Sequence, residues 1–413
     1  MSPFSAQSDA LADIHVLIVP SWWPSSEQPL AGIFFQDYAR AYAAAGARVG
    51  VIFPDLVSLR YFGRGPMAPL RPRIEQEQVD DLPVIRIRGL HTALGRPGLQ
   101  MRRYLLWLRR GLTVYRRQHG EPDVLHAMCA IPAGWACAKL GGDVVRRTIV
   151  TEHTGPFSLA LSPPSAGSFV HAALDSAAAV VAVSQHLRDQ MRQAGIQREI
   201  NVIFNPVGPQ FQPVAPPPVA VAAGSRRPCY RAAFVGRLSE LKGVRELLSA
   251  AKMLAASVSF EIEWHLVGDG PLEGEIRTAL AEKSSATRPR IILHGLCSKQ
   301  DVADVMSNSH FHILPSHGEN CPLAICEALC IGRPVIGTRG TGCEELIGKD
   351  DGVLCDIGSS ESLADAVLRL IVRYDQWDWR SISDRGHGRF SAAAVTAGYA
   401  EIIHRVVGAN RGT

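Results

Sequence analysis

Short runs rich in Val and Ile recur along the chain, and each is followed by a segment of helical character. Because parallel strands need a crossover connection, usually a helix, this alternation predicts an α/β fold with parallel sheets covered on both faces. In the first half we expect strands at His15–Pro20, Val49–Pro54, Val84–Arg88, Val124–Ala127, Thr148–Glu152, Val180–Val183 and Asn201–Phe204. A second array follows, with expected strands at Ala232–Val235, Glu263–Val267, Ile291–His294, His312–Pro315, Pro334–Gly337 and Gly352–Cys355.

The two arrays predict two domains, since a chain of 413 residues exceeds what one hydrophobic core usually serves. We expect an N-terminal Rossmann-like, doubly wound domain over 1–205 and a second one over 229–375. Between them, 206–228 is too rich in proline for a helix or central strand, which predicts a linker. Residues 376–413 are expected to form a helical end segment that can cross back to the first domain, with a terminal helix over Ala392–Val407.

Composition narrows the class of protein. With 46% hydrophobic and 20% charged residues the chain is an ordinary folded protein, and a net charge of only +4 gives no reason to expect nucleic acid as a partner. The first residues lack the features of a signal peptide, and no apolar run reaches the ~18 residues of a membrane span. We therefore expect a cytoplasmic protein. Its nine cysteines include no Cys-x-x-Cys pair, so buried reduced thiols are favoured over a zinc site.

Several chemically suggestive residues of the first domain fall where predicted strands end, the edge at which open parallel sheets bind ligands. Gly32 stands in the loop after the first strand, where either a close approach to phosphate or a plain strand-to-helix turn would explain it. His126 and His153 lie at the ends of two further strands. A single histidine is more often structural than catalytic, but two at one edge leave a catalytic role open.

In the second domain, Gly236 ends the first strand, and Arg237 and Lys242 stand five residues apart before the next helix. Paired cations suit a diphosphate, on which charge develops as a leaving group departs. Two solvated surface charges are the alternative interpretation.

The segment 315–329 carries the most information. Pro322 fits the first turn of a helix that begins after a strand-end loop. Glu319 is then in the loop, and Glu327 is more than a turn inside the helix. One carboxylate can reach sugar hydroxyls and the other a ribose, with the helix N-terminus facing phosphate.

Taken together, these motifs resemble glycosyltransferase family 4, retaining enzymes of the GT-B fold in which two Rossmann-like domains face a central cleft. The resemblance covers nearly the whole chain. It is strongest in the motifs Gly236-Arg237 with Lys242-Gly243, Val267-Gly268-Asp269-Gly270-Pro271, the Glu-x7-Glu pair Glu319 and Glu327, and Gly340-Thr341-Gly342-Cys343-Glu344-Glu345.

The resemblance implies a role for each matching residue. Arg237 and Lys242 would bind the donor diphosphate, Glu319 the donor-sugar hydroxyls and Glu327 the ribose. The loop at Gly32 would close over the phosphates, and a histidine at a strand end of the first domain would lie near the reacting carbon. The catalytic candidates are therefore His126, His153 and Glu319. The other donor-binding candidates are Gly236, Gly268, Asn320, Cys321, Pro322 and Leu323.

Two departures from the family pattern bear on these roles. Many members have a His-x-His pair where this chain has His126-Ala127-Met128. Because the second histidine is missing, His153 becomes a stronger candidate for the catalytic histidine. The loop after Glu319 reads Asn-Cys-Pro where many members have Gly-Phe, from which we expect a different fit of the donor sugar.

The implied reaction moves a hexose or N-acetylhexosamine from a nucleoside-diphosphate sugar to an acceptor hydroxyl, with retention, in bacterial polysaccharide or glycolipid assembly. No cofactor or metal is expected, because the two cations would stabilise the leaving diphosphate and the chain has no Asp-x-Asp triplet. A non-catalytic nucleotide-sugar-binding subunit on the same scaffold is the alternative.

Arginine pairs recur every seven residues between Leu99 and His119, a spacing that returns each pair to nearly the same face of a helix. We expect Trp107 to project among these cations. A solvated charged face is the common explanation, but arginines with interspersed apolar residues suit an anionic membrane surface. This favours a sugar or lipid-linked acceptor and a peripheral position on the cytoplasmic membrane. The residues of this basic stripe are Arg102, Arg103, Trp107, Arg109 and Arg110.

Overall fold

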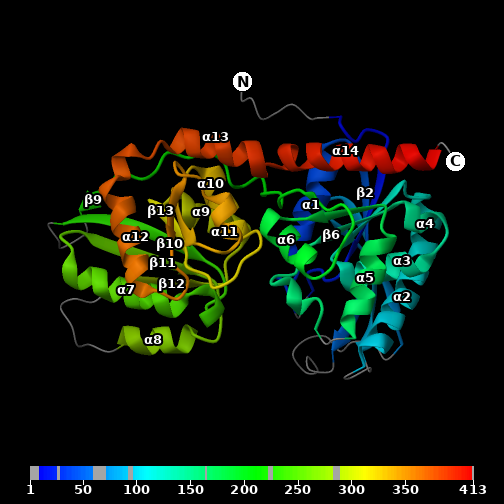
Figure 1. The fold of residues 1–413 in the computed structure, drawn as a ribbon, viewed down its shortest axis with the longest axis horizontal. Helices are drawn as coiled ribbons and strands as arrows, with labels where there is room; N and C mark the ends of the chain where they lie inside the picture. Colours follow the sequence, from blue (N-terminus) through cyan, green and yellow to red (C-terminus); the bar gives the residue numbers. More distant parts are fainter. Residues whose placement is uncertain are drawn as a thin grey trace. The chain divides into compact units, whose positions relative to one another are not determined.

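The structure is a computed structural model, and it describes residues 9–25, 28–58, 71–91, 96–162, 165–221, 227–281 and 289–411. The chain divides into two compact units: Met1–Pro206 with Ala392–Thr413, called unit 1, and Val207–Ser391, called unit 2. Each unit has one sheet with helices packed against both faces (Figure 1). The predicted α/β fold class is confirmed for both units.

The sheet of unit 1 has the strand order β3-β4-β2-β1-β5-β6-β7-β8. All neighbouring strands are parallel except β3, which is antiparallel to β4. The first strand lies inside the sheet, and the strands that follow are added on one side before the chain crosses to the other, as in a Rossmann fold. The strands are β1 His15–Pro20, β2 Arg48–Ser58, β3 Arg73–Val79, β4 Leu82–His91, β5 Val124–Met128, β6 Thr148–Glu152, β7 Ala179–Ala182 and β8 Asn201–Val202.

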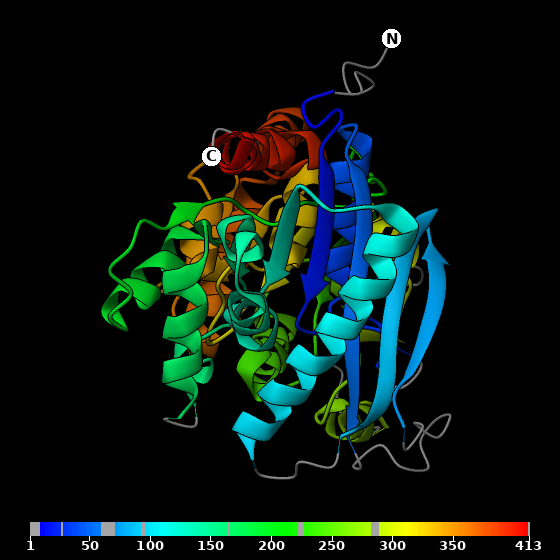
Figure 2. The ribbon, with the colours of Figure 1, turned by 90° about the vertical axis from the view of Figure 1, so that its right-hand side faces the viewer.

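Helices α1 and α14 cover one face of this sheet, and α2 crosses the other face beside β2 and β4 (Figure 2). The helices of unit 1 are α1 Ile33–Ala44, α2 Pro97–His119, α3 Trp135–Leu140, α4 Asp143–Arg146, α5 Ala166–Ser176, α6 Gln185–Gln193 and α14 Ala392–Arg411, with single turns at Ala130–Gly134 and Phe157–Leu159.

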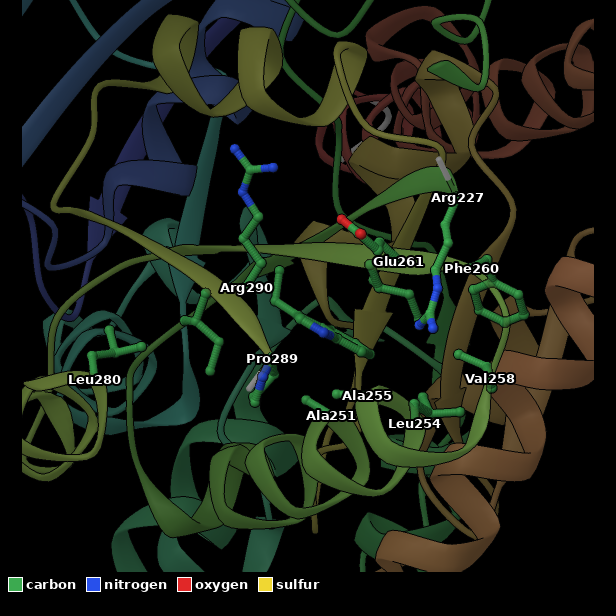
Figure 3. A pocket seen from close by; sticks show the side chains of 13 residues that line it. Arg227, Ala251, Leu254, Ala255, Val258, Phe260, Glu261, Leu280, Pro289 and Arg290 are labelled. Atoms are coloured by element: carbon green, nitrogen blue, oxygen red, sulfur yellow. The ribbon is translucent and has the colours of Figure 1, made fainter. Parts of the chain in front are cut away.

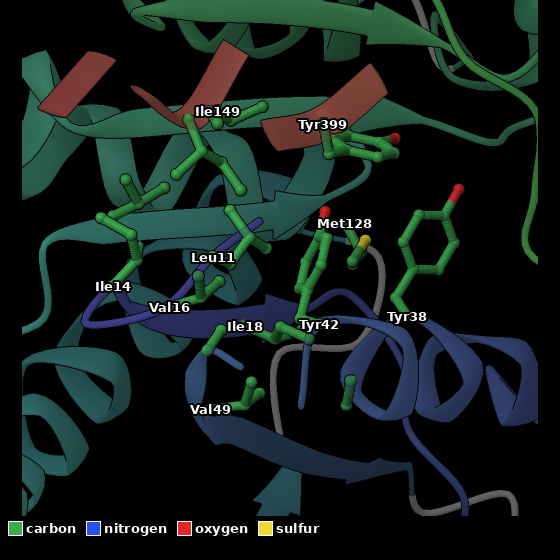
Figure 4. Packing of buried hydrophobic residues seen from close by; sticks show 14 of the residues in the cluster. Leu11, Ile14, Val16, Ile18, Tyr38, Tyr42, Val49, Met128, Ile149 and Tyr399 are labelled. Atoms are coloured by element: carbon green, nitrogen blue, oxygen red, sulfur yellow. The ribbon is translucent and has the colours of Figure 1, made fainter. Parts of the chain in front are cut away.

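Three tyrosines join α14 to the rest of unit 1. Tyr38 and Tyr42 of α1 and Tyr399 of α14 are fully buried beside Val16 and Ile18 of the first strand (Figure 4). The ring centroid of Tyr399 lies 5.7 Å from that of Tyr38 and 5.8 Å from that of Tyr42, both in edge-on contact. Such aromatic pairs stabilise packing beyond the area that they bury. They hold α14 in unit 1 although all of unit 2 precedes it in the sequence.

A glycine inside α2 lets this helix approach the sheet. Gly111 is buried, and a Cβ atom at this position would lie 2.6 Å from Ile87 Cδ1 and 2.7 Å from Ile52 Cγ2. Glycine costs about 1 kcal/mol relative to alanine inside a helix, but any side chain here would push α2 off the strands.

The sheet of unit 2 has the order β12-β11-β10-β13-β14-β15, with a short antiparallel strand β9 beside β10. This is again the Rossmann order, and its topological switch point lies between β10 and β13. The strands are β9 Ala220–Val221, β10 Pro228–Val235, β11 Glu261–Val267, β12 Arg290–Gly295, β13 Phe311–Leu314, β14 Val335–Thr338 and β15 Gly352–Cys355.

Helices α7 and α12 pack together on one face of the second sheet, whereas α9, α10 and α13 lie on the other (Figure 1). The helices are α7 Val244–Ser257, α8 Glu273–Ala281, α9 Lys299–Ser307, α10 Leu323–Ile331, α11 Gly342–Leu346, α12 Ser360–Val372 and α13 Trp379–Phe390, with single turns η4 Glu240–Lys242 and η5 Tyr374–Gln376.

Every predicted strand has a counterpart in the structure, but β3 and β9 were not predicted. In β3 only Ile74 and Val79 are apolar, and the strand forms an antiparallel edge. An edge strand of this kind lacks the continuous apolar run of a central parallel strand. The sequence pattern therefore did not reveal it.

The expected linker, 206–228, is bound to unit 2 over most of its length. From Val207 onward it belongs to that unit, and its last residues enter the sheet as β9 and the start of β10. The buried guanidinium of Arg333 donates hydrogen bonds to Val214 O (2.8 Å) and Ala215 O (3.3 Å). A proline-rich segment cannot pair fully with a sheet, and here a buried arginine satisfies its carbonyl groups.

The end segment, 376–413, divides between the units at Ala392. Helix α13 stays with unit 2, and α14 returns to unit 1. The predicted helix over Ala392–Val407 corresponds to α14, which runs on to Arg411.

Each unit contains a histidine that burial keeps neutral. Burial lowers the pKa of His126 in unit 1, and that of His312 in unit 2, from the ordinary 6.5 to about 3. Between these pH values an unfolded chain binds a proton at each position and the folded protein does not. Stability is therefore lost as the pH falls from about 6.5 towards 3, by about 1.4 kcal/mol per pH unit and per histidine.

We expect His126→Gln to make stability depend less on acid pH, because it removes one group that takes up a proton on unfolding. Urea denaturation between pH 7 and pH 4.5 should show a smaller loss of unfolding free energy than in the natural protein, even if the variant is less stable at pH 7. His404→Gln is the control, since this side chain is exposed. Equal slopes for His126→Gln and the natural protein would contradict the prediction.

Candidate active site

The predicted cations and carboxylates of unit 2 meet at the carboxyl edge of its sheet. Strands β10 and β13 are parallel neighbours, so the loops that follow them leave the sheet side by side. Lys242, after β10, donates to Glu319, after β13, with 2.5 Å between Nζ and Oε1. The Glu319 side chain is 9% exposed and that of Lys242 is 30% exposed. A cation and a carboxylate far apart in sequence thus face each other at the topological switch point.

Backbone contacts fix this pair. Leu241 O accepts hydrogen bonds from the His317 N–H (2.9 Å) and the Ser316 hydroxyl (2.8 Å). Gly243 has φ +68°, in the left-handed region, and a Cβ atom there would lie 1.9 Å from Pro315 O.

 Only glycine fits this close approach, so the turn that carries Lys242 is held against the loop that carries Glu319.

A second pair of loops interlocks beside it. The Gly342 N–H donates to Glu319 O (2.8 Å), and a Cβ atom on Gly342 would lie 1.7 Å from Asn320 O. The Thr338 hydroxyl donates to Ser316 O (2.6 Å). The loop after β14 thus supports the loop that holds Glu319, which explains the glycine-rich turn noted in the sequence.

The remaining glycines and the arginine lie on the same edge. A Cβ atom on Gly268, which has φ +129°, would lie 2.1 Å from Gly236 O, so the loops after β10 and β11 are also in close contact. Arg237 is exposed, and no hydrogen bond or ion pair joins it to the residues that the structure describes. Its guanidinium is available to an anionic ligand at this edge.

Helix α10 begins beside Glu319. Pro322 is its N-cap and Leu323 its first residue, so the proline precedes the first turn in which we expected it. Asn320 and Cys321 are buried in the preceding loop. Glu327 is half-buried more than a turn inside the helix. Glu319 thus lies in the loop that leads into the N-terminus of α10, where backbone amides can bind an anion.

Two polar residues of this edge were not singled out from the sequence. The His317 ring bonds to Glu246 in the first turn of α7, with 3.0 Å between Nε2 and Oε1. This contact anchors the loop that carries Glu319 to the helix that follows Lys242. No sequence signal identifies the pair, because the two residues are distant along the chain.

The cysteines near the site are buried thiols. Burial, together with the Glu319 carboxylate, raises the pKa of Cys343 to about 11, and burial also raises the pKa of Cys326 and Cys330. Thiols of this kind are protonated at neutral pH and unreactive. No group of three or more metal-ligating side chains occurs among the described residues.

In unit 1 the two candidate histidines, His126 and His153, have different surroundings. His126 is 1% exposed, and both ring nitrogens are occupied, Nδ1 by the Tyr42 hydroxyl (2.9 Å) and Nε2 by the Thr151 hydroxyl (2.6 Å). Thr151 also bonds to the Tyr399 hydroxyl (2.9 Å). These contacts make His126 a structural core residue, so its placement does not favour the catalytic role considered for it.

His153 follows β6 at the carboxyl edge of the first sheet. Its ring packs against Phe34, Phe35 and Tyr38, with centroids 5.3, 5.1 and 5.7 Å away. Burial lowers its pKa to about 3, while the nearby Asn205 amide acts in the opposite direction. Neither ring nitrogen has a hydrogen bond of good geometry to a described residue. A neutral imidazole at a ligand-binding edge can accept or donate a proton.

Gly32 also lies at this edge, as the N-cap of α1. It has φ +67°, and a Cβ atom would lie 2.5 Å from Trp22 O. The local turn alone therefore requires glycine, which supports the structural explanation of this residue and leaves its role towards phosphate a prediction.

The basic stripe lies on α2, with one correction. Arg102, Arg109 and Arg110 are exposed, and Arg103 is half-buried. Trp107, expected to project among them, is only 5% exposed, and a Cβ atom on Gly89 would lie 2.8 Å from its ring. Leu99 and Leu106, 40% and 48% exposed, are the large apolar side chains that α2 exposes. Within the described chain, no helix is both long and apolar enough to cross a bilayer.

A cavity of about 580 Å³ in unit 2 lies away from all of these residues (Figure 3). It is lined by the C-terminal half of α7 and by the first residues of β11 and β12, including Leu254, Glu261 and Ile291. This is the amino edge of the sheet, whereas ligands of open parallel sheets bind at the carboxyl edge. The cavity therefore does not mark the site.

Two family models match the chain, one in each half. The model described as Glycosyltransferase Family 4 matches residues 31–211, and the model described as Glycosyl transferases group 1 matches residues 230–373. The chain belongs to glycosyltransferase family 4. The second match includes the loops that carry Arg237, Lys242 and Glu319 of this family-4 transferase.

Individual relatives agree with this assignment. The family-4 transferase is 27% identical, over 86% of its chain and 88% of the relative, to a Bacillus subtilis (strain 168) protein named as the teichuronic acid biosynthesis glycosyltransferase TuaC. Its fold is similar to those of a sucrose-phosphate synthase from Thermosynechococcus elongatus (TM-score 0.70, 18% identity, 96% and 100% of the two chains) and of Anabaena HepE in complex with UDP (TM-score 0.67, 17% identity, 95% and 100%). The fold is GT-B.

The close contact at Gly342 yields a test of the site of this transferase. Gly342→Ala should displace Asn320 and with it Glu319, and so weaken binding of a nucleoside diphosphate by about tenfold or more. Gly318→Ala, in the loop that carries Glu319, is the control, because a Cβ atom there meets nothing within 4 Å. Isothermal titration calorimetry gives both affinities, and equal affinities of the two variants would contradict the expectation.

Proposed function

We propose that this protein transfers a hexose or N-acetylhexosamine from a nucleoside-diphosphate sugar to an acceptor hydroxyl in the assembly of a bacterial polysaccharide or glycolipid. The observation that carries the proposal is the contact between Lys242 and Glu319 at the switch point of unit 2. A cation and a carboxylate at one edge match the two ends of such a donor, an anionic diphosphate and a polyhydroxylated sugar.

Binding of the donor would replace the contact between Lys242 and Glu319 by contacts of each side chain to the donor. Lys242 and the unpaired Arg237 would bind the diphosphate, which frees the Glu319 carboxylate to accept hydrogen bonds from sugar hydroxyls. Glu327, further inside α10, would bind the ribose, as the family resemblance implies. Because the loops are already interlocked through Gly243 and Gly342, little reorganisation is needed.

Charge develops on the diphosphate as the glycosidic bond breaks. The two cations and the N-terminal amides of α10 would stabilise that charge, so the proposed reaction uses no metal and no other cofactor. Attack on the same face, assisted by the leaving phosphate, would give retention. His153 would stand near the reacting carbon as a neutral group, in keeping with its lowered pKa of about 3.

The acceptor would be presented at an anionic membrane surface. The exposed arginines of α2 and the exposed Leu106 form a surface with cations around apolar side chains. Each cation near anionic lipid contributes about 1 kcal/mol, so these arginines would give a reversible attraction to the membrane surface, to which the exposed Leu106 adds. We therefore propose a peripheral protein of the cytoplasmic membrane that uses a lipid-linked or sugar acceptor.

Lys242→Gln should lower transfer roughly 10²- to 10³-fold, because it removes a cation from the leaving group. Arg245→Gln, a nearby exposed cation that pairs with Glu240 and Glu275, is the control and should retain activity. Thermal-shift screening with UDP, GDP and ADP sugars first identifies the donor, since a ligand that binds the folded state raises its melting temperature. Release of nucleoside diphosphate and the anomeric configuration of the product are then measured.

An inverted product would refute retention. A protein that binds the donor but releases no nucleoside diphosphate, with or without acceptor, would be the non-catalytic binding subunit. Equal losses of transfer in the Lys242 and Arg245 variants would show that the cation at Lys242 has no special role.

Replacing all four arginines at 102, 103, 109 and 110 by glutamine should lower partitioning onto anionic vesicles by about tenfold or more. Vesicle sedimentation measures this effect. The control carries the same change of charge on exposed arginines of unit 2, namely Arg277, Arg290, Arg369 and Arg380. Failure of the natural protein to sediment, or an equal loss in the control, would refute membrane binding through α2.

A further inference from the structure

Glu152, the residue before His153, is fully buried, and the reaction described above gives it no task. Its Oε1 accepts hydrogen bonds from the backbone N–H groups of His153 (2.9 Å) and Thr154 (2.8 Å), and its Oε2 accepts one from Ala130 (2.8 Å). Buried carboxylates are rare, and a buried one needs partners of this kind. We propose that Glu152 is the positioning residue of unit 1, which holds His153 in place for the transfer reaction.

The carboxylate joins two strand ends. Ala130 follows β5, whereas His153 and Thr154 follow β6, and these strands are parallel neighbours. Cys129, before Ala130, is buried with φ +74°, a left-handed conformation that is unfavourable for residues other than glycine. Glu152 thus connects a strained turn after β5 to the turn that carries His153, and the two turns cannot move independently.

The imidazole itself is held by different groups. Phe34, Phe35 and Tyr38 of α1 surround the ring, and its nitrogens make no hydrogen bond of good geometry to a described residue. The aromatic rings restrict the side chain, and Glu152 restricts the backbone from which it projects. A small shift of this backbone would change the direction of the ring nitrogens, and misplacement of a reacting group by about 1 Å can cost 10²-fold in rate.

Only a carboxylate of this length satisfies all three donors. Glutamine has one acceptor oxygen, so its NH₂ group would face either Ala130 N–H or the N–H groups of His153 and Thr154. A buried donor left without an acceptor is destabilising, and the turn would move to relieve it. Aspartate keeps both acceptors but is one methylene shorter, so it would reach only one of the two strand ends.

The inference rests on the proposed transferase function, and the experiment separates the two. With the donor identified by thermal shift, Glu152→Gln should lower kcat about 10- to 100-fold and leave the donor KM within about twofold, because the donor is bound by unit 2. Glu152→Asp should give a smaller loss of kcat. Asp123→Asn is the matched control, since Asp123 accepts the His15 N–H (2.8 Å) at the opposite edge of the same sheet.

Circular dichroism and melting temperatures establish whether each variant is folded at the assay temperature. If Glu152→Gln does not fold, the kcat of Glu152→Asp tests the proposal. Unchanged kcat in the folded Glu152 variants would overturn the proposal, as would an equal loss in Asp123→Asn or a loss confined to KM. Full activity of His153→Asn would also overturn the proposal, because His153 would then have no role for Glu152 to support. Absence of transfer by the natural protein would overturn the proposed function instead.

Discussion

The parallel pairing of β10 with β13 is the constraint on which the carboxyl edge of the sheet of unit 2 depends. It places side by side two loops that start about 80 residues apart, so that Lys242 and Glu319 come into contact. The pairing alone would leave these loops free. Gly243 and Gly342 fix them, because each allows one backbone to approach another more closely than a side chain would permit. The strand order and the two glycines together fix the positions of the Lys242 and Glu319 charges relative to each other.

The parallel strands of unit 1 also have the Rossmann order, but the residues at their carboxyl edge are of a different kind. Where unit 2 offers Lys242 and Arg237, unit 1 offers a neutral histidine surrounded by aromatic rings, beside a carboxylate whose charge is satisfied by backbone amides. The edge of unit 2 suits an anion, and the edge of unit 1 suits a group that must be shielded from water and correctly oriented. One fold thus supplies two chemically distinct surfaces through the residues that follow its strands.

The sequence predicted the parallel strands, since strands buried on both faces are nearly continuous apolar runs. It also predicted that polar residues of the loops after these strands lie at one edge of the sheet, although their roles towards a ligand stay predictions. It could not predict what depends on distant contacts. His126 and His153 occupy similar positions in the sequence, and only Tyr42 and Thr151 identify His126 as a core residue. Trp107 is buried because Gly89 on another element leaves space for its ring.

Helix α14 has a consequence for how the protein is made. Its residues Tyr399, Ile402, Ile403 and Val406 belong to the core of unit 1, yet they leave the ribosome after every residue of unit 2. The apolar face of unit 1 that α14 covers therefore stays uncovered until the last helix has been made and has packed. Apolar surface that is exposed for a time during folding favours aggregation, so rapid docking of α14 protects unit 1.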